Sequence, residues 1–405
     1  MAEADSPASI APSRALPLIM VVSGLFGAQR GMLGPLIPLY IISLGHGFAW
    51  LGVIVAAQGA FQVLLRFFGG IFADRFGEQT VLRVGFFIMV LGSMIFIFLS
   101  AIWALIVAQL FIGASRAVHN SAAQSYASRI TEGNRAKVMG RFRGSESLGS
   151  AIGPPFAAVA ILISGGLAAG FVLVAIGNAL ALAMALVLPR IPRQQSRSVQ
   201  EIVTAIPSLF RSRPLLLAGI FAFWAAMAPS IYAVVAVPFF QESGMSDATN
   251  SGVTTVSSIG AAVGGFAFGW VASRMSQPLI AVVGMFTFGL ALFAMAATGT
   301  MPLVVLVLLL WGVTNSLVNN LRTVIAAEHS PAANRGTAVA YVGTWWAMSQ
   351  FIGPVALGLI VAAVGLQQTL VVLGVVSVPL ALLSPLLFRL LLPKLATELV
   401  PEASA

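Results

Sequence analysis

Residues 70–77 read Gly-Ile-Phe-Ala-Asp-Arg-Phe-Gly and form a short polar turn between two long apolar stretches. The turn returns later in the chain in a degenerate form. A shift of 199 residues lays Gly70 on Gly269 and Arg75 on Arg274. A match between two glycines is weak evidence, because glycine is common in this sequence, but a match between two arginines is stronger. The two turns therefore indicate that the chain consists of two similar halves.

A shift of 200 residues extends this internal repeat along both halves. It lays Pro38 on Pro238, Gly52 on Gly252, Asn120 on Asn320, Asn134-Arg135 on Asn334-Arg335, Gly153-Pro154 on Gly353-Pro354 and Gly165 on Gly365. The matches at Asn, Arg and Pro carry the signal, because these residues are scarcer here than Gly. We therefore expect a first half at 1–188, a linker at 189–213 and a second half at 214–405.

The composition is that of a membrane protein. Hydrophobic residues make up 59% of the 405 positions and charged residues 8%, whereas a soluble domain carries about a quarter charged residues. Hydropathy predicts spans at 15–42, 48–72, 79–100, 102–127, 138–164, 167–188, 214–240, 249–273, 277–298, 301–326, 336–364 and 367–392. Many of these are near the roughly 20 residues that cross a bilayer. The sequence therefore predicts an all-α polytopic membrane protein of twelve transmembrane helices, six in each half.

The net charge of +9 is distributed unevenly between the joints of these spans. The basic joints contain Arg75, Arg83, the arginines of 129–143 and 190–213, Arg274, Arg335, Arg389 and Lys394. The alternate joints, near 45, 101, 165, 245, 299 and 365, contain no Lys or Arg. By the positive-inside rule, both termini are predicted to lie in the cytoplasm, and the basic charge does not indicate nucleic-acid binding. With six spans in each half, the repeat is parallel.

Several classes of protein are disfavoured by what the sequence lacks. The first 13 residues have neither the basic flank nor the cleavage site of a signal peptide, so we expect an uncleaved protein of a prokaryotic inner membrane. The chain has no cysteine and three scattered histidines, which argues against disulfides and metal sites. It also lacks a phosphate-binding glycine motif and a nucleophile with its base, so we expect no enzyme and no cofactor.

Two six-helix halves joined by a basic linker resemble the major facilitator superfamily. The turn at 70–77 is similar to the cytoplasmic loop signature of that family, Gly-x-x-x-Asp-Arg-x-Gly. The signature positions are Gly70, Asp74, Arg75 and Gly77. Asp74 at a tight turn can face the positive end of a neighbouring helix, so we expect a latch for the cytoplasmic gate. The family usually continues with two basic residues, where this chain has Glu78-Gln79.

A second signature lies in the fifth span. Residues 149–154 read Gly-Ser-Ala-Ile-Gly-Pro and resemble the Gly-x-x-x-Gly-Pro motif associated with antiporters of the family. The residues expected to let helices pack closely are Gly149, Gly153, Pro154, Gly353 and Pro354. Arg116 resembles the arginine of the fourth-helix motif of the family. The resemblance implies the group of drug and metabolite:proton antiporters, which perform efflux.

Charged side chains inside the predicted spans carry functional information, because a centrally placed arginine costs about 2.5–3.5 kcal/mol on insertion scales. Counted from the cytoplasmic ends, Arg116 and Glu146 lie at depths of about 16 and 12 Å on antiparallel helices. We therefore predict that they form an ion pair, either static or opened by protonation. Arg30 has no carboxylate at its depth, so it faces helix dipoles or awaits an anionic group of the substrate. His119 is the next candidate for a proton carrier.

The remaining polar and aromatic side chains inside the spans suit an amphipathic organic ligand. Asn120 follows Arg116 by one helical turn and extends a polar ridge. The corresponding helices of the second half carry aromatic and neutral hydrogen-bonding side chains. The expected substrate-binding residues are Arg30, Arg116, Asn120, Trp224, Tyr232, Trp311, Asn315 and Asn319.

These observations predict a secondary active transporter in which two six-helix bundles rock about a central site. We expect proton-coupled export of a small organic molecule by a functional monomer, with proton coupling at Glu146, Arg116 and His119. One alternative is uptake or exchange of an organic anion through Arg30 and Arg116. A further alternative is a non-transporting membrane sensor or assembly subunit, although no soluble signalling domain is recognised.

Overall fold

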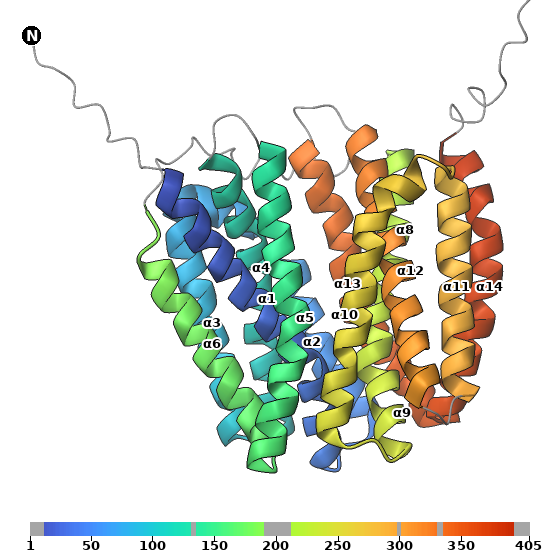
Figure 1. Ribbon diagram of the computed structural model, residues 1–405, viewed down its shortest axis with the longest axis horizontal. Helices are drawn as coiled ribbons and strands as arrows, with labels where there is room; N and C mark the ends of the chain where they lie inside the picture. Colours follow the sequence, from blue (N-terminus) through green and yellow to red (C-terminus); the bar gives the residue numbers. More distant parts are fainter. Residues whose placement is uncertain (1–11, 131–134, 190–211, 298–300, 330–334, 393–405) are drawn as a thin grey trace, which may run out of the picture.

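The computed structural model describes residues 12–130, 135–189, 212–297, 301–329 and 335–392, which form helices and the turns between them (Figure 1). The first half contains α1 (Pro12–Ser43), α2 (Phe48–Phe76), α3 (Glu78–Phe98), α4 (Ile102–Arg129), α5 (Arg135–Ser164) and α6 (Ala168–Leu186). The second half contains α8 (Arg213–Ile231), the π-helical turn η1 (Tyr232–Ala236), α9 (Val237–Glu242), α10 (Asp247–Ala272), α11 (Gln277–Ala297), α12 (Met301–Glu328), α13 (Arg335–Val364) and α14 (Leu366–Leu391).

The predicted fold class is confirmed. Within the described ranges, twelve helices are long and apolar enough to cross a membrane, with α8, η1 and α9 forming one of them. Some helices extend beyond the apolar stretch from which they were predicted, because helical backbone hydrogen bonding continues into the polar residues that follow. For example, α2 ends at Phe76 rather than at residue 72. The linker predicted at 189–213 lies almost entirely outside the described residues.

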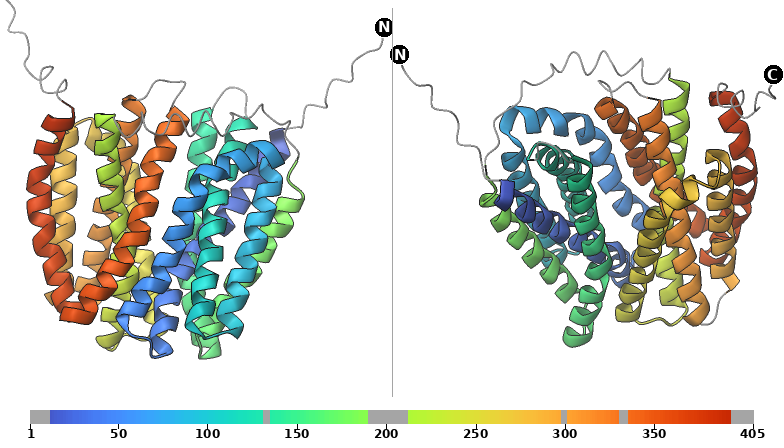
Figure 2. Two further views of the ribbon diagram at one scale, coloured as in Figure 1. Left: turned by 180° about the vertical axis from the view of Figure 1, so that it is seen from behind. Right: turned by 45° about the horizontal axis from the view of Figure 1, so that its top comes forward.

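The two halves form bundles that lie side by side (Figure 2). We call the end at which α1 begins and α14 ends the terminal end. The opposite end, with the turns at 44–47, 165–167 and 243–246, is the far end. At the far end one buried core includes residues of both halves, among them Leu36, Ile41, Leu51, Val234, Phe240 and Leu366.

Toward the terminal end this core divides into two. One cluster contains only residues of the first half, among them Val22, Phe86, Tyr126 and Phe142. The other cluster contains only residues of the second half, among them Phe221, Leu321, Tyr341 and Phe388. The halves are therefore joined at the far end and packed separately at the terminal end.

Two pairs of helices join the halves, and the 200-residue repeat relates them. α2 packs against α13, where a Cβ added to Gly52 would lie 3.1 Å from the Cα of Gly358. α5 packs against α10, where a Cβ added to Gly252 would lie 3.9 Å from the Cβ of Ala158. Gly52 and Gly252 are repeat equivalents, as are Ala158 and Gly358, so the same contact occurs twice. The α2–α13 contact is the closer one because glycine stands on both sides.

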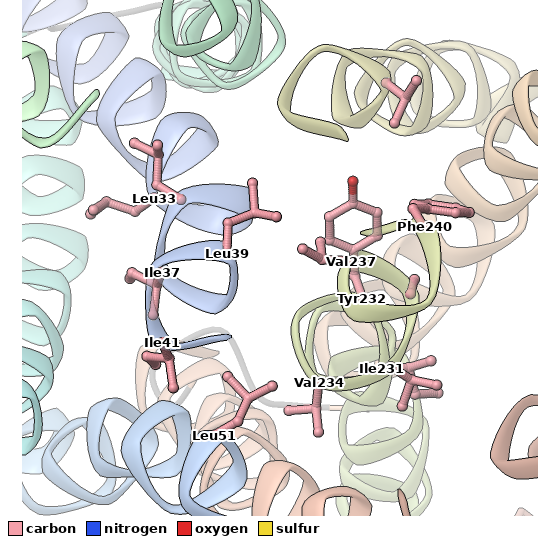
Figure 3. Close-up of a cluster of buried hydrophobic side chains, with 14 of the residues drawn as sticks. Leu33, Ile37, Leu39, Ile41, Leu51, Ile231, Tyr232, Val234, Val237 and Phe240 are labelled. Atoms are coloured by element: carbon pink, nitrogen blue, oxygen red, sulfur yellow. The ribbon is translucent and has the colours of Figure 1, made fainter. Parts of the chain in front are cut away.

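Apolar side chains of both halves fill the space between these two pairs. Figure 3 shows Leu39 of α1 and Leu51 of α2 opposite Val234 and Val237 of the second half. Tyr232 begins the π-helical turn, and its Oη lies 2.7 Å from Thr254 Oγ1 of α10. This hydrogen bond holds the irregular turn against its neighbour at the place where the far end is sealed.

α1 and α5 pack closely along a stripe of small residues. A Cβ added to Gly149 would lie 1.9 Å from the carbonyl oxygen of Gly24. A Cβ added to Gly153 would lie 2.1 Å from the carbonyl oxygen of Ala28. In membranes such small residues let helix backbones approach each other and gain van der Waals contact. The first-half residues of the fifth-span signature thus lie at a contact within one bundle.

In the second-half copy of this signature, Gly353 lies at a looser contact than Gly153 does. Gly353 faces α8, where its added Cβ would lie 2.9 Å from Met227 Sδ and 3.3 Å from Ser230 Oγ. Pro354 faces α2, with its carbonyl oxygen 2.3 Å from the Cβ that Gly52 would carry. Side chains, rather than backbone atoms, therefore separate α13 from α8.

We expect Gly149→Ala to lower the free energy of unfolding by about 1–3 kcal/mol, because the added methyl group overlaps a backbone carbonyl of α1. Gly144→Ala is the matched control. It lies on the same helix with no atom within 4 Å of an added Cβ, so its stability should stay the same or rise slightly. Thermal unfolding of both variants in detergent measures the difference. Equal melting temperatures would contradict a tight contact at Gly149.

Candidate functional site

Glu146 differs from the other described acidic residues in its position within a helix. The others lie in the first or last turn of a helix: Asp74, Glu78, Glu242, Asp247 and Glu328. Glu146 is in the interior of α5 and is 4% exposed. Its Oε1 accepts a hydrogen bond of 2.8 Å from Arg30 Nη1, and its Oε2 accepts one of 3.4 Å from Arg143 Nη1. The result is a buried carboxylate between two arginines.

The predicted partner of Glu146 was wrong, since the carboxylate pairs with Arg30 and not with Arg116. The statement that Arg30 has no carboxylate at its depth was wrong for the same reason. The stripe of small residues explains both errors. The carbonyl oxygen of Glu146 lies 2.0 Å from the Cβ that Gly27 would carry, so α5 sits directly on α1 one turn before Arg30. Depth along a helix axis does not report which neighbour a residue faces.

Arg116 and His119 lie on α4 beside this pair. The imidazole of His119 stacks on Phe26 of α1 with ring centroids 3.6 Å apart. Arg116 is one turn from His119, and Arg30 is one turn from Phe26, both toward the far end. Since α1 and α4 run in opposite directions, this stacking places the two arginines at a similar level. The charge of Arg30 accordingly acts on Arg116.

Several polar atoms in this region are buried without a hydrogen-bond partner in the described residues. They are Arg116 Nε and both ring nitrogens of His119. Both amide atoms of Gln29 are likewise unpartnered, and its Nε2 lies 3.2 Å from the Cβ that Gly177 of α6 would carry. His119 is also boxed by Phe86, whose ring centroid lies 5.5 Å away. Buried polar atoms are usually hydrogen-bonded. These atoms are therefore free to bind a ligand or water, or to form a hydrogen bond in another conformation. Gln29 was not among the predicted site residues, and its signal was an amide inside an apolar span.

Arg116, Asn120 and Gln124 form a half-buried ridge, whereas His119 beside them is buried. This is the one-turn spacing from which the ridge was predicted. Arg116 is thus accessible along one face of α4.

The predicted aromatic residues of the second half pack against one another. Trp224 and Trp311 both contact Phe288, with ring centroids 4.9 and 4.7 Å apart. Tyr232 contacts Trp311 at 6.5 Å. Trp311 is 4% exposed and Tyr232 7%, while Trp224 is half-buried. In this conformation Trp224 is the most accessible of the three.

The predicted asparagines of α12 bind groups of the protein. Asn315 Nδ2 donates to the carbonyl oxygen of Ala225 at 3.3 Å. Asn319 Oδ1 accepts from Arg322 Nε at 2.8 Å, and that guanidinium lies 4.8 Å from the ring centroid of Trp346. In this conformation both side-chain amides therefore form hydrogen bonds within the second half.

The repeat shows what is particular to the first half. The 200-residue shift lays Arg30 on Ser230 and Glu146 on Trp346. At the second-half contact, Gln350 Nε2 donates to the carbonyl oxygen of Ala226 at 2.6 Å and to Ser230 Oγ at 3.3 Å. Among the described side chains, the equivalent helices of the second half thus pack without an ion pair. The second-half helices therefore pack without charges at the positions equivalent to Arg30 and Glu146.

The predicted gate turn is described in part. Gly77 adopts a positive φ of 86°, a conformation that favours glycine. Arg75 is exposed, with its guanidinium 5.7 Å from the ring centroid of Phe76. The surroundings of Gly70 and the side chain of Asp74 lie outside what the structure describes, so the proposed latch at Asp74 stays a prediction.

Glu78 and Gln79, which depart from the family signature, connect three helices of the first bundle. Glu78 is 1% exposed and pairs with Arg129 of α4. Gln79 Nε2 donates to the carbonyl oxygen of Pro189 at 2.6 Å, and Tyr126 Oη donates to the same oxygen at 3.0 Å. This network anchors the chain just after α6, where the predicted linker begins.

The comparisons with known proteins agree with this architecture. Residues 19–243 and 225–403 match the family model of the Major Facilitator Superfamily. The chain belongs to this superfamily. It is a multi-pass membrane protein and a secondary transporter of this type, a class that is not enzymatic.

Individual proteins of known function share only about a quarter of their aligned residues with this chain. The chain is 25% identical over 355 residues to the synaptic vesicular amine transporters of Rattus norvegicus and Homo sapiens. The alignments cover 86% of this chain and 67% and 68% of those proteins. These relatives do not establish membership in the drug:proton antiporter group, which the fifth-span signature implied.

Solved structures share the fold at low sequence identity. A nucleoside transporter, NupG, superposes with a TM-score of 0.77 at 15% identity, covering 93% of this chain and 99% of that one. A D-xylose-proton symporter superposes with a TM-score of 0.73 at 14% identity, covering 91% and 96%. These likenesses show the fold alone.

Proposed function

We propose that this chain is a proton-coupled transporter of a small organic molecule and that Glu146 takes up and releases the proton. The observation that carries the proposal is the buried carboxylate held between Arg30 and Arg143. It is the only described acid in a helix interior, and its repeat equivalent in the second half is Trp346. A buried charge inside a membrane-spanning helix is a candidate for function.

The proton step follows from the surroundings of the carboxylate. While Arg30 is within hydrogen-bond distance, the ionised form of Glu146 is stabilised by a charge-assisted hydrogen bond. If Arg30 moves away, the carboxylate is left among α1, α4 and α5 with fewer counter-charges, and the neutral form becomes favoured. Both residues lie in the same bundle, so the event that separates them is a ligand engaging Arg30. Separation on one side of the membrane would thus bind a proton, and re-formation of the pair on the other side would release it.

The joined far end and the separate terminal end support alternating access. If the terminal end is cytoplasmic, as the distribution of arginines predicts, this conformation faces the cytoplasm. The other state would require the α2–α13 and α5–α10 contacts to open at the far end. The name of the fold neighbour, a D-xylose-proton symporter, is consistent with proton coupling in this fold.

The test is transport into proteoliposomes containing the purified chain under an imposed pH gradient, screened against drug-like and anionic compounds. We expect accumulation of at least one compound that collapses when a protonophore dissipates the gradient. The control is the same vesicles without protein. Transport that is equally fast with and without the gradient would contradict proton coupling.

We also propose that both termini are cytoplasmic in a prokaryotic inner membrane. Reporter fusions at Ala2, Gln195 and Ala403 should then report the cytoplasm, and a fusion at Asp247 should report the periplasm. The reason is the absence of Lys and Arg from alternate joints. A periplasmic signal at Gln195 would overturn both the orientation and the parallel arrangement of the halves.

A further inference from the structure

The charges around Glu146 do not balance. Arg30 and Arg143 contact its carboxylate, and Arg116 lies at the level of Arg30 without an ion pair among the described residues. Three guanidinium groups and one carboxylate give this cluster a net charge of two positive units. Arginine within a membrane-spanning helix is costly unless a counter-charge accompanies it.

The helices packed against α5 do not supply that counter-charge. α6 has no titratable side chain, and α10 has only Asp247, in its first residue at the far end. α1 carries Tyr40 besides Arg30 in its described side chains, and Tyr40 packs against aromatic rings near the far end. The remaining titratable side chain beside the cluster is His119, on which the charges of Glu146, Arg30 and Arg143 act.

The other titratable groups of α4 are engaged at the terminal end. Tyr126 binds the carbonyl oxygen of Pro189, and Arg129 pairs with Glu78. They therefore do not reach the cluster. No described carboxylate is left to neutralise Arg116.

The arginines of the cluster are accessible, unlike the carboxylate that they share. The side chain of Arg30 is 41% exposed and that of Arg143 is 53% exposed, against 5% for Glu146. Arg116 is half-buried, with its Nε unpartnered. A molecule that reaches this region meets guanidinium groups before it meets the carboxylate.

We propose that the substrate carries an anionic group, a carboxylate or a phosphate, which binds Arg116 and Arg30, and that anion and proton cross the membrane together. The proposal rests on the proposed role of Glu146 as the proton-binding group. It names a substrate class opposite in charge to an amine. An amine would have to approach the single interior carboxylate through three arginines.

The sign of the coupling follows from Coulomb's law. An anion that engages Arg30 competes with Glu146 for the same guanidinium, so Glu146 loses its counter-charge and binds a proton. The cluster then carries the same net charge when empty and ionised as when it holds a monovalent anion and a proton. Binding of the two is mutually reinforcing, which is the condition for symport. A cationic substrate would instead compete with the proton, which is the condition for exchange.

This sign favours uptake of an organic anion over the proton-driven export that the fifth-span signature implied. The signature residues Gly149 and Gly153 account for the α1–α5 contact without reference to direction. The charge of the ligand at Arg116 and Arg30 decides between symport and exchange, and an inward proton gradient then drives uptake by symport.

The experiment measures thermal stabilisation and proton uptake by the purified full-length chain with compounds paired by skeleton. The pairs are indole-3-acetate with tryptamine, benzoate with benzylamine, gluconate with glucamine, and glucose 6-phosphate with glucosamine. We expect stabilisation by at least one anion and by none of the amines. Carboxylates and the phosphate ester are separate arms that identify the anionic group. If amines stabilise and anions do not, or if no anion stabilises, the proposal is overturned.

Variants separate this proposal from the proposed function. Arg116→Gln should weaken binding of the stabilising anion by about tenfold or more, as expected for loss of a charge-assisted contact. Arg116→Lys should retain part of the binding, and Arg389→Gln, which removes an arginine elsewhere, should retain all of it. Unchanged binding in Arg116→Gln would contradict the anion site.

Proton uptake on anion binding, followed with a pH dye in weak buffer, tests the coupling. The wild-type chain should take up protons when the anion binds, and Glu146→Gln should bind the anion without taking up protons. Uptake that persists in Glu146→Gln would refute the role of Glu146 while leaving the anion site standing. Proton release on anion binding would refute symport.

Discussion

Glu146→Gln should reduce accumulation driven by a pH gradient to the level of protein-free vesicles, while exchange of substrate at equal pH continues. Glutamine mimics the protonated carboxylate, so the variant occupies the proton-loaded form at every pH. Accumulation needs net proton movement, whereas exchange only requires the loaded form to cross the membrane. Both activities are measured in the same vesicles with the anion identified by thermal stabilisation.

The matched control for this prediction is Glu328→Gln. Glu328 lies in the last turn of α12, where its Oε2 accepts a hydrogen bond of 2.9 Å from Gln277 Nε2 in an exposed position. Removing that charge should change neither activity. Gradient-driven accumulation at the wild-type level in Glu146→Gln would show that the cluster is structural and that the proton path lies elsewhere, with His119 the next residue to examine.

The double variant Ala158→Cys/Gly252→Cys should lose transport completely under oxidising conditions and regain it on reduction. The two Cβ positions lie 3.9 Å apart across the α5–α10 contact, within the 3.5–4.5 Å typical of disulfides. The cross-link would hold the two halves together at the far end, and alternating access requires that this end open. The chain has no native cysteine, so no other thiol can form the bond.

The two single-cysteine variants are the controls, and both should transport under either condition. Mobility in non-reducing gels after proteolysis between the halves measures the extent of cross-linking. Full transport by a quantitatively cross-linked sample would contradict opening at the α5–α10 contact. Failure to cross-link would contradict the joined far end.

The sequence alone was sufficient for the architecture. A composition this apolar leaves lipid as the only solvent for most of the chain, and only helices satisfy every backbone group within a single segment. Residues scarcer than glycine, such as Asn120 and Pro154, recur at one spacing and predict two halves. Charges inside apolar spans are costly, so Arg30, Arg116 and Glu146 stood out as candidates before any contact was known.

The partners of those charges were decided by the tertiary structure. The position of a residue along a helix sets its depth in the membrane and the side of the helix on which it lies. Which neighbouring helix it contacts depends on lateral packing, and the glycines of α1 and α5 determine that packing by allowing backbone contact. That packing brings Glu146 to Arg30 instead of Arg116. Likewise Glu78, which stands where the family usually has a basic residue, pairs with Arg129 because α3 and α4 lie side by side. Sequence spacing records position along one helix, whereas ion pairs form between helices whose relative rotation only the packed fold sets.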